Sequence, residues 1–145
     1  MTETINVVCP GCGATNRFPA EASGKTVVCG RCKALLPPPG RVLEPSADQL
    51  AVLIQKSGLP LLIDFYSETC VPCRMMHPIL ESLAARRAGD LTVVRVNTAA
   101  LPDMARAFRV EAVPTFVMIK NGVERGRTMG AMNETDFSLW AASKS

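Results

Sequence analysis

The sequence predicts an α/β domain with a mixed central sheet covered by helices on both faces, preceded by a small cysteine-rich module. From residue 41 onward, strand and helix patterns follow the order β-α-β-α-β-α-β-β-α, which favours a sheet layered between helices. Residues 37–40 read Pro-Pro-Pro-Gly, which cannot continue a helix or a central strand and favours an extended connector. We therefore expect a module over residues 1–36, a linker over 37–40 and the α/β domain over 41–145.

The composition is that of a globular protein, with 48% hydrophobic and 20% charged residues in a chain of 145. The net charge of +3 is too weak and scattered to indicate a nucleic-acid partner. Apolar stretches such as Leu59–Phe65 are much shorter than a membrane span, and the N-terminus lacks the pattern of a signal peptide. We expect a cytoplasmic monomer that binds no nucleic acid, no membrane and no organic cofactor.

Turn and cap residues delimit the first elements of the domain. A short strand is expected over Arg41–Leu43. Ser46 and Gln49 have the spacing of a capping box at the start of a helix, and Gly58 suits the end of that helix. The apolar run Leu61–Tyr66 then predicts a buried strand.

A long helix is expected directly after that strand, over Cys70–Ala88, with a kink at Pro78 and a stop at Gly89. The later elements are a strand, a helix, two strands joined by an Asn-Gly turn, and a closing helix. Their expected ranges, in that order, are Leu91–Val96, Leu101–Phe108, Thr115–Lys120, Val123–Met129 and Asn133 to the C-terminus.

All six cysteines fall into CxxC pairs. Because we see no signal peptide, metal binding and redox chemistry fit these pairs better than the disulfide framework of a secreted protein. The pairs are Cys9/Cys12, Cys29/Cys32 and Cys70/Cys73.

The third pair opens a predicted helix directly after a buried strand. This position places Cys70 beside unpaired N–H groups that stabilise a thiolate, and Pro72 fits the first turn because its missing N–H costs nothing there. The spacing lets Cys70 attack a substrate disulfide and lets Cys73 resolve the mixed disulfide. The alternatives are a zinc knuckle or two buried thiols.

The first two pairs are separated by sixteen residues, a spacing typical of a tetrahedral zinc site with four thiolates. The module has few large apolar side chains, so it needs the free energy of metal binding to fold. We therefore expect one zinc ion held by Cys9, Cys12, Cys29 and Cys32. Two disulfides or an iron–sulfur centre are the alternatives.

Residues 41–145 resemble the thioredoxin family at several separated points. The matching motifs are Ile63-Asp64-Phe65-Tyr66, Pro78, Val113-Pro114-Thr115, Asn121-Gly122 and Met129-Gly130-Ala131. The resemblance implies a thioredoxin fold and a protein-disulfide reductase that works through a redox-active Cys70–Cys73 disulfide.

The resemblance also implies roles for residues around that disulfide. Asp64 would lie beneath it as a buried carboxyl with a raised pKa and exchange protons with Cys73. Pro114 would face the disulfide in the cis form, with substrate contacts from the backbone at Val113 and at Gly130. The alternative for Asp64 is a solvent-facing aspartate at a strand end.

Three positions depart from the family pattern, in which the site reads Trp-Cys-Gly-Pro-Cys. Thr69 replaces the tryptophan and Val71 replaces the glycine, which changes the surface for substrate docking and leaves the reduction potential open. Arg95 stands where a lysine is common, and it either holds Asp64 ionised more strongly or is an exposed strand charge. His77, the only histidine, either tunes the thiols or, as we expect, lies on the helix surface.

A four-cysteine zinc ribbon joined to such a domain is similar to the bacterial thioredoxin 2 group. That similarity implies a structural zinc, reduction of protein disulfides in the cytoplasm, and recharging by an NADPH-dependent thioredoxin reductase. A second hypothesis makes the fold a scaffold for zinc-dependent binding or holdase activity, or an oxidant sensor that releases metal. An exported oxidant or isomerase conflicts with the missing signal peptide.

Overall fold

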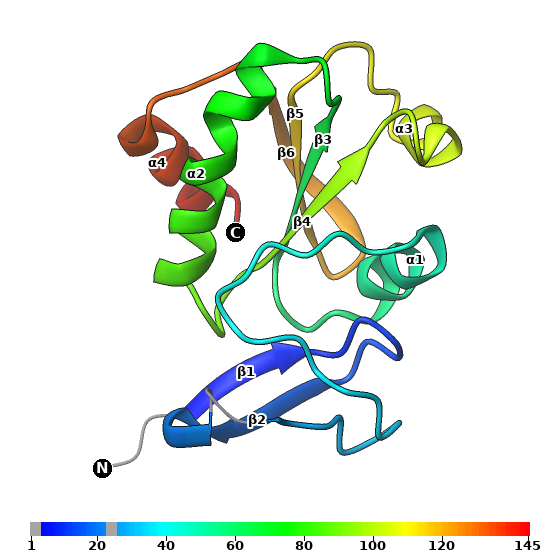
Figure 1. The fold of residues 1–145 in the computed structure, drawn as a ribbon, viewed down its shortest axis with the longest axis vertical. Helices are drawn as coiled ribbons and strands as arrows, with labels where there is room; N and C mark the ends of the chain where they lie inside the picture. The colour runs from blue at the N-terminus through cyan, green and yellow to red at the C-terminus, as the bar shows by residue number, and fades with distance from the viewer. Residues whose placement is uncertain (1–3, 23–25) are drawn as a thin grey trace.

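Two sheets organise the chain in a computed structural model that describes residues 4–22 and 26–145 (Figure 1). A small antiparallel pair, β1 (Thr4–Val8) and β2 (Thr15–Pro19), lies at one end and is followed by a 3-10 turn, η1 (Ala20–Ala22). Residues 1–3 and 23–25 of the predicted N-terminal module lie outside the described residues.

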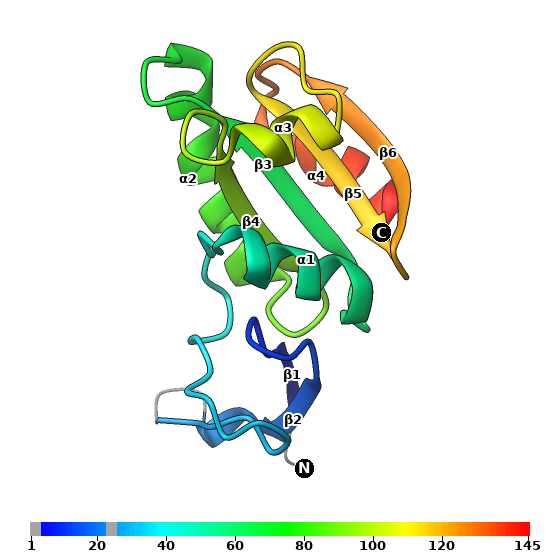
Figure 2. The same ribbon diagram turned by 90° about the vertical axis from the view of Figure 1, so that its right-hand side faces the viewer.

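The larger sheet belongs to the predicted α/β domain. Its strands and helices, in chain order, are α1 (Ala47–Lys56), β3 (Leu61–Tyr66), α2 (Val71–Arg86), β4 (Thr92–Asn97), α3 (Pro102–Ala107), β5 (Thr115–Lys120), β6 (Val123–Met129) and α4 (Glu134–Lys144). The strand order is β4-β3-β5-β6, with β3 parallel to β4 and the other pairs antiparallel. Helices α2 and α4 cover one face while α1 and α3 cover the other (Figures 1 and 2), so the predicted mixed sheet with two covered faces is confirmed.

Side chains of β3 alternate between the two hydrophobic cores. Leu62 packs with Phe137 of α4 in the core that α2 and α4 cover. Ile63 packs with Leu53 of α1 in the other core. Because alternate residues of a strand share a face, Asp64 points to the same side as Leu62, toward α2.

Most predicted boundaries agree with the structure to within two residues. The Ser46 hydroxyl accepts the Gln49 N–H at 3.2 Å and the Gln49 side chain accepts the Ser46 N–H at 3.0 Å, so the predicted capping box is confirmed. Asn121 and Gly122 both have positive φ, which the two-residue turn between β5 and β6 requires. Helix α2 ends at Arg86 rather than Ala88. Within the described residues, no helix is long and apolar enough to cross a membrane.

The strand predicted over Arg41–Leu43 is wrong, because only Leu43 pairs with the sheet. Its N–H donates to the Val93 carbonyl at 3.0 Å, and its carbonyl accepts the Arg95 N–H at 2.8 Å. The next hydrogen bond of a parallel ladder would come from the N–H of residue 45. That residue is Pro45, which has no N–H, so the pairing stops after one bridge.

The N-terminal module packs directly against the α/β domain. Val8, only 2% exposed, belongs to the same core as Leu50 and Leu53 of α1. The turn at Gly13 also touches α1 so closely that an added Cβ would lie 2.4 Å from the Lys56 Cβ. The module and the domain therefore share buried apolar surface, and the stability of one is linked to that of the other.

Substitution of Val8 tests this linkage. We expect Val8→Ala to lower the free energy of unfolding by about 2 kcal/mol, because it removes buried methyl groups from a shared core. Guanidinium titration followed by Trp140 fluorescence is the measurement, since this single tryptophan stacks on Phe137 across the sheet from Val8. The same substitution at half-exposed Val28 is the control. An unchanged Trp140 transition in Val8→Ala would mean that the module folds independently.

Candidate active site and metal centre

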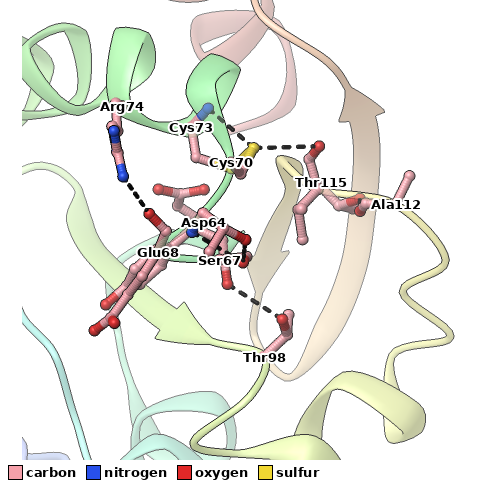
Figure 3. Close-up of a disulfide and its surroundings, with 12 residues drawn as sticks. Asp64, Ser67, Glu68, Cys70, Cys73, Arg74, Thr98, Ala112 and Thr115 are labelled. Atoms are coloured by element: carbon pink, nitrogen blue, oxygen red, sulfur yellow. Dashed lines mark hydrogen bonds between the residues drawn. A yellow bond between two sulfur atoms is a disulfide. The ribbon is translucent and has the colours of Figure 1, made fainter.

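A disulfide joins Cys70 and Cys73 at the N-terminus of α2 (Figure 3), at the end of the domain far from β1 and β2 (Figure 1). Cys70 is the N-cap residue, and its Sγ accepts the Cys73 N–H at 3.2 Å. Cys73 is buried, whereas Cys70 is partly exposed. The helix terminus therefore stabilises negative charge on the sulfur of Cys70, the more exposed of the two cysteines.

The loop before β5 lies against this disulfide. The Val113–Pro114 peptide is cis, as expected, and the Val113 carbonyl oxygen lies 3.6 Å from the Cys70 Sγ. The Pro114 carbonyl accepts the Gly130 N–H at 3.0 Å. Gly130 has φ of +88° and open space where a Cβ would lie. The structure thus brings Val113, Pro114 and Gly130 together beside Cys70.

Two of the residues that depart from the family pattern, Thr69 and Val71, are the sequence neighbours of Cys70 and lie on the surface. Thr69 and Val71 are both exposed, and Thr69 closes the turn before α2 through its contact with Ser67, Oγ1 to Oγ at 3.1 Å. Met75, one turn after Val71 on α2, and Met129, next to Gly130, are also exposed large apolar side chains. Sequence reasoning missed both methionines. They could have been identified as apolar residues near the disulfide, one a helical turn after Val71 and the other beside Gly130.

Asp64 is fully buried on β3, directly opposite Arg95 of β4. Arg95 Nε lies 3.4 Å from Asp64 Oδ2, and Oδ1 has no hydrogen-bond partner among the described residues. Figure 3 shows Asp64 beneath the disulfide. Burial raises the pKa of Asp64 to about 6, because the opposing charge of Arg95 offsets only part of the lost hydration. A solvent-facing Asp64 and an exposed Arg95 are both ruled out by these contacts.

Arg95 has two further partners. Its guanidinium carbon lies 3.8 Å from the centre of the Tyr66 ring, and its Nη1 lies 3.6 Å from Glu44 Oε1. The Tyr66 hydroxyl donates to the same Glu44 oxygen at 2.7 Å, and burial together with Glu44 raises the pKa of Tyr66 to about 12. Sequence reasoning missed Glu44, because no local pattern connects it to a strand fifty residues later. Tyr66 could have been identified, because it follows Asp64 by two residues on one strand and so lies on the same face of the sheet.

His77 lies on the surface of α2, as expected, beside Pro78 inside the helix. Its Nε2 lies 3.1 Å from Glu81 Oε1, one turn further along the same helix.

The four remaining cysteines, Cys9, Cys12, Cys29 and Cys32, converge on one point in the N-terminal module. Their sulfurs all lie within 4.8 Å of one another, and the pairs Cys9/Cys32 and Cys12/Cys29 are each 3.6 Å apart. A tetrahedral zinc–thiolate site has sulfurs about 3.8 Å apart, whereas a disulfide needs about 2 Å. All four are free thiols, so the donor set fits a metal ion.

Two equivalent turns present these sulfurs. Cys9 and Cys29 each donate their N–H to the carbonyl five residues on and accept the N–H of the residue four positions on, with all four bonds at 2.8–2.9 Å. The residues at that fourth position, Gly13 and Lys33, both have positive φ. Backbone N–H groups, that of Cys32 foremost, lower the pKa of Cys29. The turn at Cys29 therefore favours a thiolate, whereas burial raises the pKa of Cys9 to about 11.

Comparison with known proteins points to one family. The family model described as Thioredoxin matches residues 41–143. Thioredoxin C-3 of Corynebacterium nephridii is 35% identical over 138 residues, covering 92% of this chain and 91% of that protein, so the match extends into the N-terminal module. A bifunctional thioredoxin reductase/thioredoxin of Mycobacterium leprae is 36% identical over 78 residues, covering 54% of this chain and 17% of that protein.

The solved structures support the same fold. A mutant thioredoxin from Halobacterium salinarum superposes with a TM-score of 0.66 at 26% identity, covering 73% of this chain and 92% of that one. The thioredoxin fold expected from the sequence is therefore confirmed.

The buried carboxyl makes stability depend on pH. In the folded chain the pKa of Asp64 is about 6, above the value of about 3.9 for an unfolded aspartate, so the folded state binds this proton more tightly. Stability contributed by the protonated carboxyl is present at low pH and is lost as the pH rises through these values. We expect Asp64→Asn to raise the free energy of unfolding of the oxidised protein by about 2 kcal/mol at pH 8 and by far less at pH 4.

Denaturant unfolding of wild type and variant at both pH values measures this difference. Asp90→Asn, which neutralises an exposed aspartate, is the control. An equal gain at pH 4 and pH 8 would contradict a raised pKa at Asp64.

Proposed function

We propose that this chain, which belongs to the thioredoxin family, reduces protein disulfides through attack by Cys70 and resolution by Cys73. Family membership makes the chain a thiol-disulfide oxidoreductase of the protein-disulfide reductase type. The observation that carries the proposal is the disulfide at a helix N-terminus, in which only Cys70 is open to solvent.

The reaction proceeds in two exchanges. The reduced Cys70 thiolate attacks one sulfur of a substrate disulfide, so that bond breaks and the first substrate thiolate leaves. Cys73, as a thiolate, then attacks the Cys70 sulfur, which breaks the mixed disulfide and releases the second substrate thiolate. Two electrons pass to the substrate and the Cys70–Cys73 disulfide forms. The proton that Cys73 loses goes to Asp64, whose pKa of about 6 and unpartnered Oδ1 suit a buried proton acceptor.

The substrate segment docks beside the loop that holds Pro114. The backbone at Val113 and Gly130 supplies polar contacts next to Cys70, because a positive φ and the absent Cβ at Gly130 leave room for a second chain. Val71, Met75 and Met129 supply apolar contact in place of the indole that Thr69 lacks. An extended, partly apolar peptide suits this surface.

An NADPH-dependent thioredoxin reductase returns the protein to its dithiol form in the cytoplasm. The relative from Mycobacterium leprae, whose name joins a thioredoxin reductase to a thioredoxin, supports such a partner. The reductase supplies the two electrons that each turnover consumes.

One zinc ion is held by Cys9, Cys12, Cys29 and Cys32, as in the bacterial thioredoxin 2 group. The convergent sulfurs support this ligand set, and the match to Thioredoxin C-3 covers part of this module. When bound, the ion supplies folding free energy that the small module lacks. It lies away from the disulfide and takes no part in thiol exchange.

Serine variants of the two cysteines test the redox proposal. We expect Cys70→Ser to lose insulin-disulfide reduction to background, because the attacking sulfur is gone. Cys73→Ser should instead accumulate a mixed disulfide with substrate, visible on a non-reducing gel, because nothing resolves it. Turnover by Cys70→Ser equal to wild type would reject the mechanism and favour a scaffold or holdase.

Metal analysis tests the N-terminal centre. Protein purified under reducing conditions should contain about one zinc per chain, and Cys12→Ser should lower this content, because one of four thiolates is lost. Chelation should also lower the melting temperature of the wild type, since metal binding stabilises only the folded state. The absence of zinc from freshly reduced protein, or a melting temperature that chelation leaves unchanged, would contradict the proposed zinc site.

A further inference from the structure

We propose that Glu44 is a positioning residue of the redox site. Its carboxylate interacts with the same Arg95 guanidinium as Asp64 does, and it thereby keeps Asp64 able to take the proton from Cys73. The proposal rests on the proposed function, in which Asp64 is the proton acceptor. Nothing in the motifs around the cysteines points to Glu44, because it lies ahead of α1 and far from them in sequence.

The backbone around Glu44 is fixed from both sides. Leu43, on its N-terminal side, forms the single bridge to β4 with hydrogen bonds to Val93 and Arg95. Pro45, on its C-terminal side, is buried and leads into the capped start of α1. Glu44 is therefore held next to β4, while its side chain remains 58% exposed.

Arg95 is the shared partner of two carboxylates. Its Nε lies 3.4 Å from Asp64 Oδ2 and its Nη1 lies 3.6 Å from Glu44 Oε1. An arginine side chain carries a permanent positive charge in proteins, and only 11% of this one is exposed. Each carboxylate is attracted by this cation and repelled by the other carboxylate. The ionised form of Asp64 is therefore stabilised less than it would be by Arg95 alone.

Tyr66 holds this arrangement in place from two directions. Its ring packs against the guanidinium of Arg95, so the cation keeps its position without help from Glu44. Its hydroxyl donates to Glu44 Oε1, the same oxygen that faces Arg95. The carboxylate of Glu44 is thus fixed at the outer end of the guanidinium, while Asp64 lies at the inner end.

The charges that act on Asp64 come from three directions. Arg95 on β4 and His77 on α2 lower the pKa of Asp64, whereas Glu44 ahead of α1 raises it. Cys73, the other titratable group of α2 at this site, is bound in the disulfide in this structure, and β5 presents apolar Phe116 at the position opposite Asp64. Loss of the Glu44 charge therefore leaves Arg95 and His77 to favour the ionised form of Asp64 more strongly.

Glu44→Gln tests the proposal, because the amide keeps an oxygen that accepts from Tyr66 but carries no charge. In the reduced full-length protein, carbon-13 NMR follows the titration of the Asp64 carboxyl, and Asp64→Asn identifies its signal. We expect the titration midpoint, and the acid limb of the insulin-reduction profile, to move down by about 0.5 pH unit, the size expected for one solvent-screened charge. Tyr66→Phe, which keeps the ring but frees Glu44, should give a smaller shift in the same direction.

Glu21→Gln, which removes an exposed charge from the N-terminal module, is the matched control and should leave the Asp64 midpoint unchanged. The role of Glu44 would be overturned if the Asp64 titration midpoint in Glu44→Gln stayed constant or rose. That result would leave the redox function intact, provided that Cys70→Ser is inactive. Failure of the redox function would appear separately, as wild-type activity in Cys70→Ser, and would leave the NMR titration of Asp64 as a valid test.

Discussion

The burial of one carboxyl group beneath the disulfide is the constraint on which the rest of the site depends. Asp64 lies in β3, one of the two inner strands of the sheet, covered by α2, where its charged form loses the hydration it would have in water. Arg95 enters from the neighbouring strand because the parallel register of β3 and β4 places the two residues opposite each other. The fold thus keeps an ionisable group inside a hydrophobic core, where burial raises its proton affinity and the buried cation Arg95 offsets part of that rise.

The same architecture separates reactivity from stability. The N-terminus of α2 and the loop with Pro114 meet at one end of the sheet, where Cys70 is reachable and Cys73 is not. At the other end, the four-cysteine module inserts Val8 into the core that α1 covers. In the function that we propose, metal binding there strengthens the scaffold under α1 without placing a second reactive centre beside the disulfide. The six cysteines are thus divided in space, with two in the disulfide at one end of the sheet and four in the cluster at the other.

Local chemistry made much of this structure predictable from the sequence. The capping box at Ser46, the Asn121-Gly122 turn and the apolar run of β3 each determine their own element within a few residues. The four-cysteine cluster followed from spacing, and the cis peptide before Pro114 from family resemblance. Non-local pairing was harder. Whether Arg95 faced Asp64 or solvent depended on the β3–β4 register, and the contact of Glu44 depended on a bridge that Pro45 cuts to a single residue.

The reduction potential of the Cys70–Cys73 pair tests the central claim most directly, because it decides whether the pair donates or accepts electrons. Equilibration of the full-length, metal-loaded protein against defined ratios of reduced to oxidised glutathione, read by thiol alkylation, gives the value. A disulfide reductase requires a potential more negative than about −240 mV, in the region of the cytosolic glutathione couple or below it. A potential near −120 mV, where strong disulfide oxidants lie, would contradict this account.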